Sequence, residues 1–158
     1  MRVEQIMARP VQFCRPEDSL AHAAQLMWDH DCGCLPVLAG DAGTGVAGMI
    51  TDRDICMCAL FEKRPLEDLR VSTAMAKQVQ LCRPYDDLRK AEKIMRTALI
   101  RRLPVVDDDG VLVGMISLAD LAQEALRERD TTKREISEKA VGHTLAAICR
   151  AQHRELAA

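Results

Sequence analysis

The sequence GMITDRD at residues 48–54 recurs 66 positions later as GMISLAD at residues 114–120. Upstream of each copy, LPV at residues 35–37 recurs 68 positions later as LPV at residues 103–105. The spacing is constant apart from two residues, and such a difference belongs in a surface loop between the two motifs. A period of nearly 70 residues is too long for a solenoid unit, so the chain is interpreted as a duplicated domain.

Within each copy, apolar spacing predicts the secondary structure. Leu20, Ala23 and Met27 share one face of a helix for which Asp18 or Ser19 is the expected N-cap. Apolar runs separated by turn residues then predict paired strands, at 35–38 with 46–50 and at 103–106 with 111–116. A second helix follows Thr51 or Ser117. The predicted class is α/β of the α+β type, with a small sheet and two helices per copy, preceded by a short extended segment near Val11 or Val79.

The same pattern divides the chain into four segments. Residues 1–61 form the first repeat, the charged stretch 62–70 with Pro65 forms a linker, and residues 71–122 form the second repeat. Residues 123–158 are predicted to be a helical extension, because apolar residues keep near-helical spacing there. We expect this extension to be interrupted or weakened around Thr131-Thr132 and at Gly142.

Composition narrows the function classes. A net charge of −2 among 158 residues gives no basic field for nucleic acid, and four aromatic residues offer few stacking platforms. No apolar run is long enough to span a bilayer, and the first ten residues lack the apolar core of a secretory signal. We therefore expect a cytoplasmic protein that contacts neither membrane nor nucleic acid, with its seven cysteines as free thiols.

Three elements, repeated in order, resemble the CBS domain, a module named after cystathionine beta-synthase. They are the opening segment (3–7 or 71–75), the Leu-Pro-Val strand, and a closing Gly-x-x-Thr/Ser-x-x-Asp box, and the likeness covers about residues 3–122. The resemblance implies a pseudo-two-fold pair of repeats with two clefts between them, often a homodimer. It also implies a regulatory module that senses AMP, ADP, ATP, S-adenosylmethionine or NAD(H), without enzymatic activity or an obligatory cofactor, and signals to a separate effector protein.

The closing box has a chemistry of its own. The junction between strand and helix presents unpaired N–H groups and the positive end of the helix dipole, which attract phosphate. The hydroxyls of Thr51 and Ser117 are predicted to bind phosphate, and the carboxylates of Asp54 and Asp120 to accept from ribose hydroxyls. The same pattern also favours a capping box without any ligand, and the two roles are compatible.

Neighbouring residues complete the predicted ligand sites. Apolar strand residues are expected to sandwich a flat base: Pro36, Val37 and Ile50, with Pro104, Val105 and Ile116 in the second copy. Arg53, Arg101 and Arg102 are expected to contact phosphate. The first copy carries Leu38-Ala39 where the second has Val106-Asp107, and its loop is longer, so the two clefts are not assumed to be equivalent.

Two alternatives remain open. The first alternative to a ligand sensor is a structural dimerisation or interaction module with empty clefts. The second is a thiol or metal protein that uses Cys32, Cys34, Cys56 and Cys58. The latter is disfavoured because Cys56 and Cys58 lie on a predicted helix, where positions i and i+2 point apart. Catalysis finds no support, since neither a Gly-x-Ser-x-Gly elbow nor a P-loop is present. The acidic run 107–110 is interpreted as a solvated turn.

Overall fold

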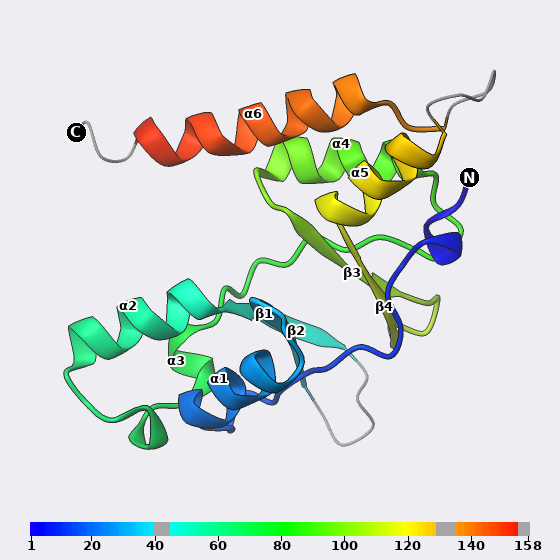
Figure 1. The fold of residues 1–158 in the computed structure, drawn as a ribbon. Coiled ribbons are helices and arrows are strands. Elements are labelled where there is room, and N and C mark those ends of the chain that lie inside the picture. The colour runs from blue at the N-terminus through cyan, green and yellow to red at the C-terminus, as the bar shows by residue number, and fades with distance from the viewer. Residues whose placement is uncertain (40–44, 129–134, 155–158) are drawn as a thin grey trace. The chain divides into compact units, whose positions relative to one another are not determined.

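The computed structural model describes residues 1–39, 45–128 and 135–154. The chain folds into two compact units (Figure 1). The repeat-1 unit consists of Val11–Val79 and Asp109–Leu112, and the repeat-2 unit consists of Met1–Pro10, Gln80–Asp108 and Val113–Ala158. The mixed α/β class predicted from the sequence is confirmed.

The repeat-1 unit contains a two-stranded sheet and its helices. Its elements are α1 (Leu20–Asp29), β1 (Cys34–Leu38), β2 (Val46–Thr51), α2 (Asp52–Glu62), a 3-10 turn (Leu66–Asp68) and the short helix α3 (Val71–Ala74). Strands β1 and β2 are antiparallel, with Pro36 opposite Met49. Of the two N-caps expected for helix α1, Ser19 is the one that the structure uses, because its hydroxyl accepts from the backbone N–H of His22 at 3.1 Å.

The repeat-2 unit follows the same plan and adds a C-terminal helix. Its elements are a 3-10 turn (Val3–Gln5), α4 (Leu88–Ala98), β3 (Arg102–Val106), β4 (Leu112–Ser117), α5 (Leu118–Arg127) and α6 (Glu138–Arg154). The predicted interruption at Gly142 is wrong, since α6 runs through it. A glycine costs a helix only about 1 kcal/mol, and the buried neighbours Val141 and Thr144 hold this one in place. The other expected break, at residues 131–132, lies outside the described residues.

The leading segments of the two repeats are exchanged between the units. Ala8, from the start of repeat 1, pairs with Met115 of β4 through backbone bonds of 2.8 and 3.2 Å. Ala76, from the start of repeat 2, pairs with Met49 of β2 through bonds of 2.9 and 2.8 Å. The repeats and the compact units are therefore different divisions of the chain, and the four-segment division remains a prediction.

Each unit has its own hydrophobic core. In the repeat-1 unit the core is centred on the predicted apolar positions Leu20, Ala23, Leu35, Val37 and Ile50. In the repeat-2 unit it is centred on their counterparts Leu88, Ala91, Leu103, Val105 and Ile116, and residues of α6 extend it. Leu69, within the expected linker, is also buried, and its carbonyl accepts from the N–H of Leu20 at 2.9 Å. Among the described residues, no helix has the length and apolar character required to cross a membrane.

Candidate ligand-binding site

The first closing box lies where β2 meets α2. Thr51 is the N-cap of α2, and its hydroxyl accepts from the N–H of Asp54 at 3.2 Å. The Thr51 N–H and hydroxyl in turn donate to Asp54 Oδ2 at 2.9 and 2.7 Å. The predicted capping box is therefore confirmed, and it fixes the carboxylate against the start of the helix.

The second box has nearly the same geometry at the junction of β4 and α5. The Ser117 hydroxyl accepts from the N–H of Asp120 at 3.2 Å, and the Ser117 N–H and hydroxyl both donate to Asp120 Oδ2 at 2.7 Å. The single hydroxyl proton of Ser117, like that of Thr51, is already donated. Either hydroxyl can donate to a phosphate only by giving up its 2.7 Å bond to the aspartate.

The second carboxylate oxygen of each aspartate is differently placed. Oδ1 of Asp54 and Oδ1 of Asp120 accept no hydrogen bond from the part of the chain that the structure describes, and both residues are half-buried. Each box therefore offers one carboxylate oxygen that accepts no hydrogen bond from the described chain, on a residue that is partly exposed. Such an oxygen can accept from the hydroxyls of a sugar without any change in the helix cap.

The charge around the two boxes is reversed. In the repeat-1 unit, the first helical residue is Asp52, whose N–H donates to the carbonyl of Gly33 at 3.3 Å. In the repeat-2 unit, the same positions hold Leu118 and Arg101, and the Leu118 N–H donates to the Arg101 carbonyl at 2.9 Å. From repeat 1 to repeat 2, the carboxylate of Asp52 is therefore replaced by the apolar Leu118, and Gly33 is replaced by the positively charged Arg101.

The wider surroundings strengthen this difference. The first box and the positions beside it carry three carboxylates and one arginine, Asp31, Asp52, Asp54 and Arg53, of which Asp31 and Asp52 line the same pocket. At the matching positions of the second copy the sequence has one carboxylate and two exposed arginines, Asp120, Arg101 and Arg102, and the backbone bond to Leu118 brings Arg101 next to the box. The Arg53 N–H also donates to the Asp52 carboxylate at 2.7 Å, so one backbone donor of α2 is used internally. The second box is the better place for an anion.

The apolar residues that were predicted to sandwich a base are not brought to a surface. Val37, Ile50, Val105 and Ile116 are completely buried in the two cores. Pro36 and Pro104 are buried as well, and their carbonyls accept from Cys14 and Cys82 at 3.1 Å. A base could touch these side chains only if their neighbours moved. Their role as ligand contacts, like that of the exposed Arg53, Arg101 and Arg102, remains a prediction.

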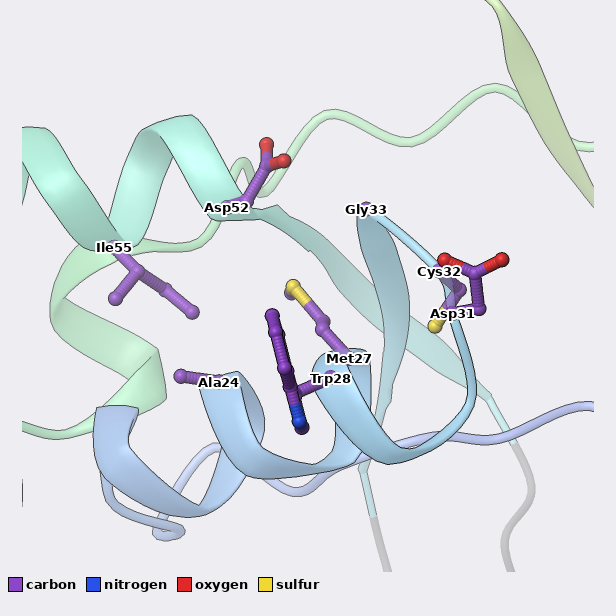
Figure 2. Close-up of a pocket in the computed structure, with 8 residues that line it drawn as sticks. All are labelled: Ala24, Met27, Trp28, Asp31, Cys32, Gly33, Asp52 and Ile55. Carbon is purple, nitrogen blue, oxygen red and sulfur yellow. The ribbon is translucent and has the colours of Figure 1, made fainter.

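A pocket of about 370 Å³ lies in the repeat-1 unit. Figure 2 shows that its residues come from α1, from the turn after α1, and from the first turns of α2. Its walls are Ala24, Met27, Trp28, Asp31, Cys32, Gly33, Asp52 and Ile55. None of the predicted ligand residues lines it. The single tryptophan of the chain, Trp28, directly after the predicted core residue Met27, was a sequence signal that could have indicated this surface.

The cysteines differ in exposure. Burial, reinforced by Asp18, raises the pKa of Cys14 to about 12, and burial with Asp86 raises the pKa of Cys82 to about 12. Cys56 and Cys149 are exposed. Within residues 1–39, 45–128 and 135–154, no three His, Cys, Asp or Glu side chains come together in a way that could hold a metal ion.

This difference predicts a selective alkylation pattern. With iodoacetamide at pH 8, we expect Cys56 and Cys149 to be modified, whereas Cys14 and Cys82 stay protected. With a pKa near 12, only about one buried thiol in ten thousand is a thiolate at that pH. Peptide mass spectrometry would read the sites, and the same reaction in urea, where all seven cysteines should react, is the control. Modification of Cys14 as fast as Cys56 would contradict the prediction.

Comparison with known proteins agrees with this architecture. The CBS domain family model matches residues 3–59 and 67–127. The CBS domain-containing protein YhcV of Bacillus subtilis is 35% identical over 120 residues, which is 76% of this chain and 82% of that protein.

Two solved structures have the same fold. Hypoxic Response Protein I, with two coordinated zinc ions, matches with a TM-score of 0.69 and 27% identity over 78% of this chain and 98% of that one. CBSX2 in complex with AMP matches with a TM-score of 0.68 and 25% identity over 81% of this chain and 98% of that one. The repeated boxes, the two similar units and these matches together establish that the chain belongs to the CBS domain family, with two CBS repeats in tandem.

Proposed function

We propose that this CBS pair is a regulatory module that binds an adenine nucleotide at the box of repeat 2, formed by Ser117 and Asp120. The charge reversal between the boxes carries the proposal, because Arg101 and Leu118 replace Gly33 and Asp52. In this site Asp120 Oδ1 accepts from the ribose hydroxyls, while the first turn of α5 and the Arg101 guanidinium stabilise phosphate. The AMP bound to CBSX2, a protein with the same fold, supports this ligand class.

The box of repeat 1 suits a different ligand. Asp31 and Asp52 repel phosphate, so we propose that this box takes an uncharged or cationic adenosine derivative, such as S-adenosylmethionine, or stays empty. NAD(H), with its two phosphates, is expected to prefer repeat 2 for the same reason as AMP, ADP and ATP.

The proposed output is conformational rather than chemical. Stand-alone CBS-domain proteins are typically regulatory, and we propose no enzymatic activity and no obligatory cofactor for this chain. A ligand that binds one arrangement of the repeats more tightly shifts the population toward it. An effector protein then senses the change. Homodimer formation and a cytoplasmic location are also part of the proposal.

Thermal unfolding with AMP, ADP, ATP, NAD, NADH and S-adenosylmethionine tests the assignment. We expect a nucleotide at 100 times its Kd to stabilise the protein by about 2.7 kcal/mol. Asp120→Asn should abolish that stabilisation, and Asp54→Asn should preserve it. Asparagine keeps an oxygen that can accept the cap N–H, so both variants stay folded. The ligand-induced shift is compared within each variant, which cancels any change in its basal stability.

Two results would reject the proposal. If only Asp54→Asn loses the nucleotide effect, the charge argument is wrong. If none of the six compounds stabilises the wild type, the structural module with empty clefts becomes the better account. The metal alternative is supported by the zinc ions in Hypoxic Response Protein I and is tested by elemental analysis of the purified protein. Stoichiometric zinc or iron that is lost in a Cys32→Ser, Cys34→Ser variant would establish it.

A further inference from the structure

A cavity of about 400 Å³ lies in the repeat-2 unit, between α4 and the start of α6. Figure 1 shows these two helices side by side. The polar residues that line the cavity are Arg89, Glu92, Lys93 and Arg96 on α4, and Glu135 and Ser137 on the chain that enters α6. A volume of this size suits a small metabolite. No residue of the two closing boxes contributes to this α4–α6 cavity.

Lys93 lies in a row of like charges on α4. On a helix, the neighbours of a residue are those three and four positions away. For Lys93 these are Arg89, Lys90, Arg96 and Thr97, so three of the four are cations and none is a carboxylate. The Lys93 ammonium makes no hydrogen bond or ion pair with any residue that the structure describes. Like charges at this spacing destabilise a helix, and a bound anion would remove that cost.

The two carboxylates of the cavity are engaged with other groups. Glu92 is buried and accepts from the hydroxyl of Thr144 on α6. Its Oε1 lies 3.8 Å from Nε of Arg96, which is beyond hydrogen-bonding distance. The Glu135 carboxylate is paired with the amino group of Met1 at 2.8 Å. The wall of the cavity therefore keeps a surplus of positive charge.

The remaining polar groups of the cavity are donors. Nε of Arg89 donates to the carbonyl of Glu135 at 3.0 Å, which holds the guanidinium against the chain that enters α6. The Ser137 hydroxyl accepts from the N–H of Ala140 at 3.2 Å, and its own proton is donated to no residue in the described part of the chain. An ammonium, two guanidinium groups and a hydroxyl thus line one cavity, and this set of donors suits a phosphate group.

The internal repeat shows that the fold does not require these charges. The counterparts of the three cations on α4, 68 positions earlier, are Ala21, Gln25 and Trp28. Helix α1 has the same place in the repeat-1 unit as α4 has in the repeat-2 unit, and it forms without any of the three. The row of cations is therefore a feature of the α4–α6 cavity and not of the repeated fold.

We propose that the α4–α6 cavity binds a small phosphorylated molecule, with its phosphate group between Lys93 and Arg96. Arg89 and Ser137 donate to the same group from the side of α6. This site shares no residue with the nucleotide site proposed at Ser117 and Asp120. Binding at the two sites can therefore succeed or fail separately.

Isothermal titration calorimetry of the full chain at constant ionic strength tests the site. The probes are inorganic pyrophosphate and ribose 5-phosphate, which present phosphate without and with a sugar. We expect saturable binding, and the tighter of the two probes identifies the source of the phosphate. Lys93→Gln and Arg96→Gln should each weaken it by about tenfold or more, because each removes a hydrogen bond between charged groups.

Two controls accompany these variants. Lys90→Gln removes the same charge from the same helix, but Lys90 lies outside the cavity and is paired with Asp86 at 2.7 Å, so phosphate binding should persist. The Tm of the ligand-free protein should stay the same or rise in Lys93→Gln, because an exposed cation is removed from a row of like charges. Loss of binding in that variant is then not an effect of unfolding.

Three results would overturn the proposal. The first is the absence of saturable binding of either probe to the wild type. The second is an equal loss of binding in Lys90→Gln and Lys93→Gln, which would mean that only the net charge matters. The third is loss of binding in Arg101→Ala and not in Lys93→Gln, which would place the phosphate at the box of repeat 2. None of these results decides whether AMP binds through Asp120, which the thermal shifts measure independently.

Discussion

Replacing Gly48 with alanine is expected to lower the free energy of unfolding by about 1–3 kcal/mol, the usual cost of overpacking. A Cβ at this position would lie 2.8 Å from Met75 Sδ and 2.9 Å from the carbonyl oxygen of Ala76. The sulfur can move, but the carbonyl cannot, because Ala76 is held to Met49 by two backbone bonds. To relieve the close contact with the carbonyl, the backbone around Ala76 must therefore move away from β2.

The equivalent substitution Gly114→Ala is expected to cost less. The close contacts there are all with the flexible side chain of Met7, whose Cγ would lie 2.9 Å from the new Cβ. A change of rotamer can relieve them. The comparison thus measures how much of the cost at Gly48 comes from the backbone contact.

Urea unfolding followed by circular dichroism is the appropriate measurement, since the single tryptophan is already exposed in the native state. Gly142→Ala provides the control, because a Cβ there meets no atom within 4 Å and should stabilise α6 by about 0.5–1 kcal/mol. Equal losses at Gly48 and Gly114 would show that the backbone of Ala76 yields, and that the exchanged segment is held more loosely than its hydrogen bonds suggest.

Gly48 also shows where sequence reasoning stops. The repeat predicted the two helices and two strands of each copy, because apolar spacing and capping residues are local signals. It did not predict that Ala8 pairs with Met115 of β4 and Ala76 with Met49 of β2. Which sheet a short segment joins depends on contacts that are distant in sequence, and both sheets present similar edges.

The candidate site was predicted in part, for a related reason. The Thr/Ser-x-x-Asp motif identified both capping boxes, but it does not specify the two residues between the hydroxyl and the carboxylate residue. Asp52 and Leu118 occupy the same position in the two boxes, and the backbone hydrogen bonds to the carbonyls of Gly33 and Arg101 showed which residue lies beside each of them. Glu92 was missed altogether, because a glutamate on a helix normally indicates solvent and not a buried contact.

Glu92 contacts Thr144 of α6. The largest loss of stability is expected from a substitution on the buried side of this helix. Ile148→Ala should lower the free energy of unfolding of the repeat-2 unit by about 2–5 kcal/mol, the cost of truncating a buried isoleucine. Ile148 is 2% exposed and packs in the core of that unit. Leu145→Ala is the control on the same helix, since Leu145 is 45% exposed and its truncation should change stability by less than about 1 kcal/mol.

Hydrogen exchange of the amides in α6 shows how the stability is lost. If α6 is an integral part of the unit, Ile148→Ala accelerates exchange in α4, α5 and α6 by similar factors, and urea unfolding shifts as one transition. If α6 opens by itself, only its own amides exchange faster, and the urea midpoint of the remaining unit barely moves. We expect the first result, because Thr144 donates to Glu92, and opening α6 would remove that hydrogen bond from a buried carboxylate, leaving it only the ion pair with Arg96 at 3.8 Å. Equal effects of Ile148→Ala and Leu145→Ala would instead mean that α6 does not pack on this core.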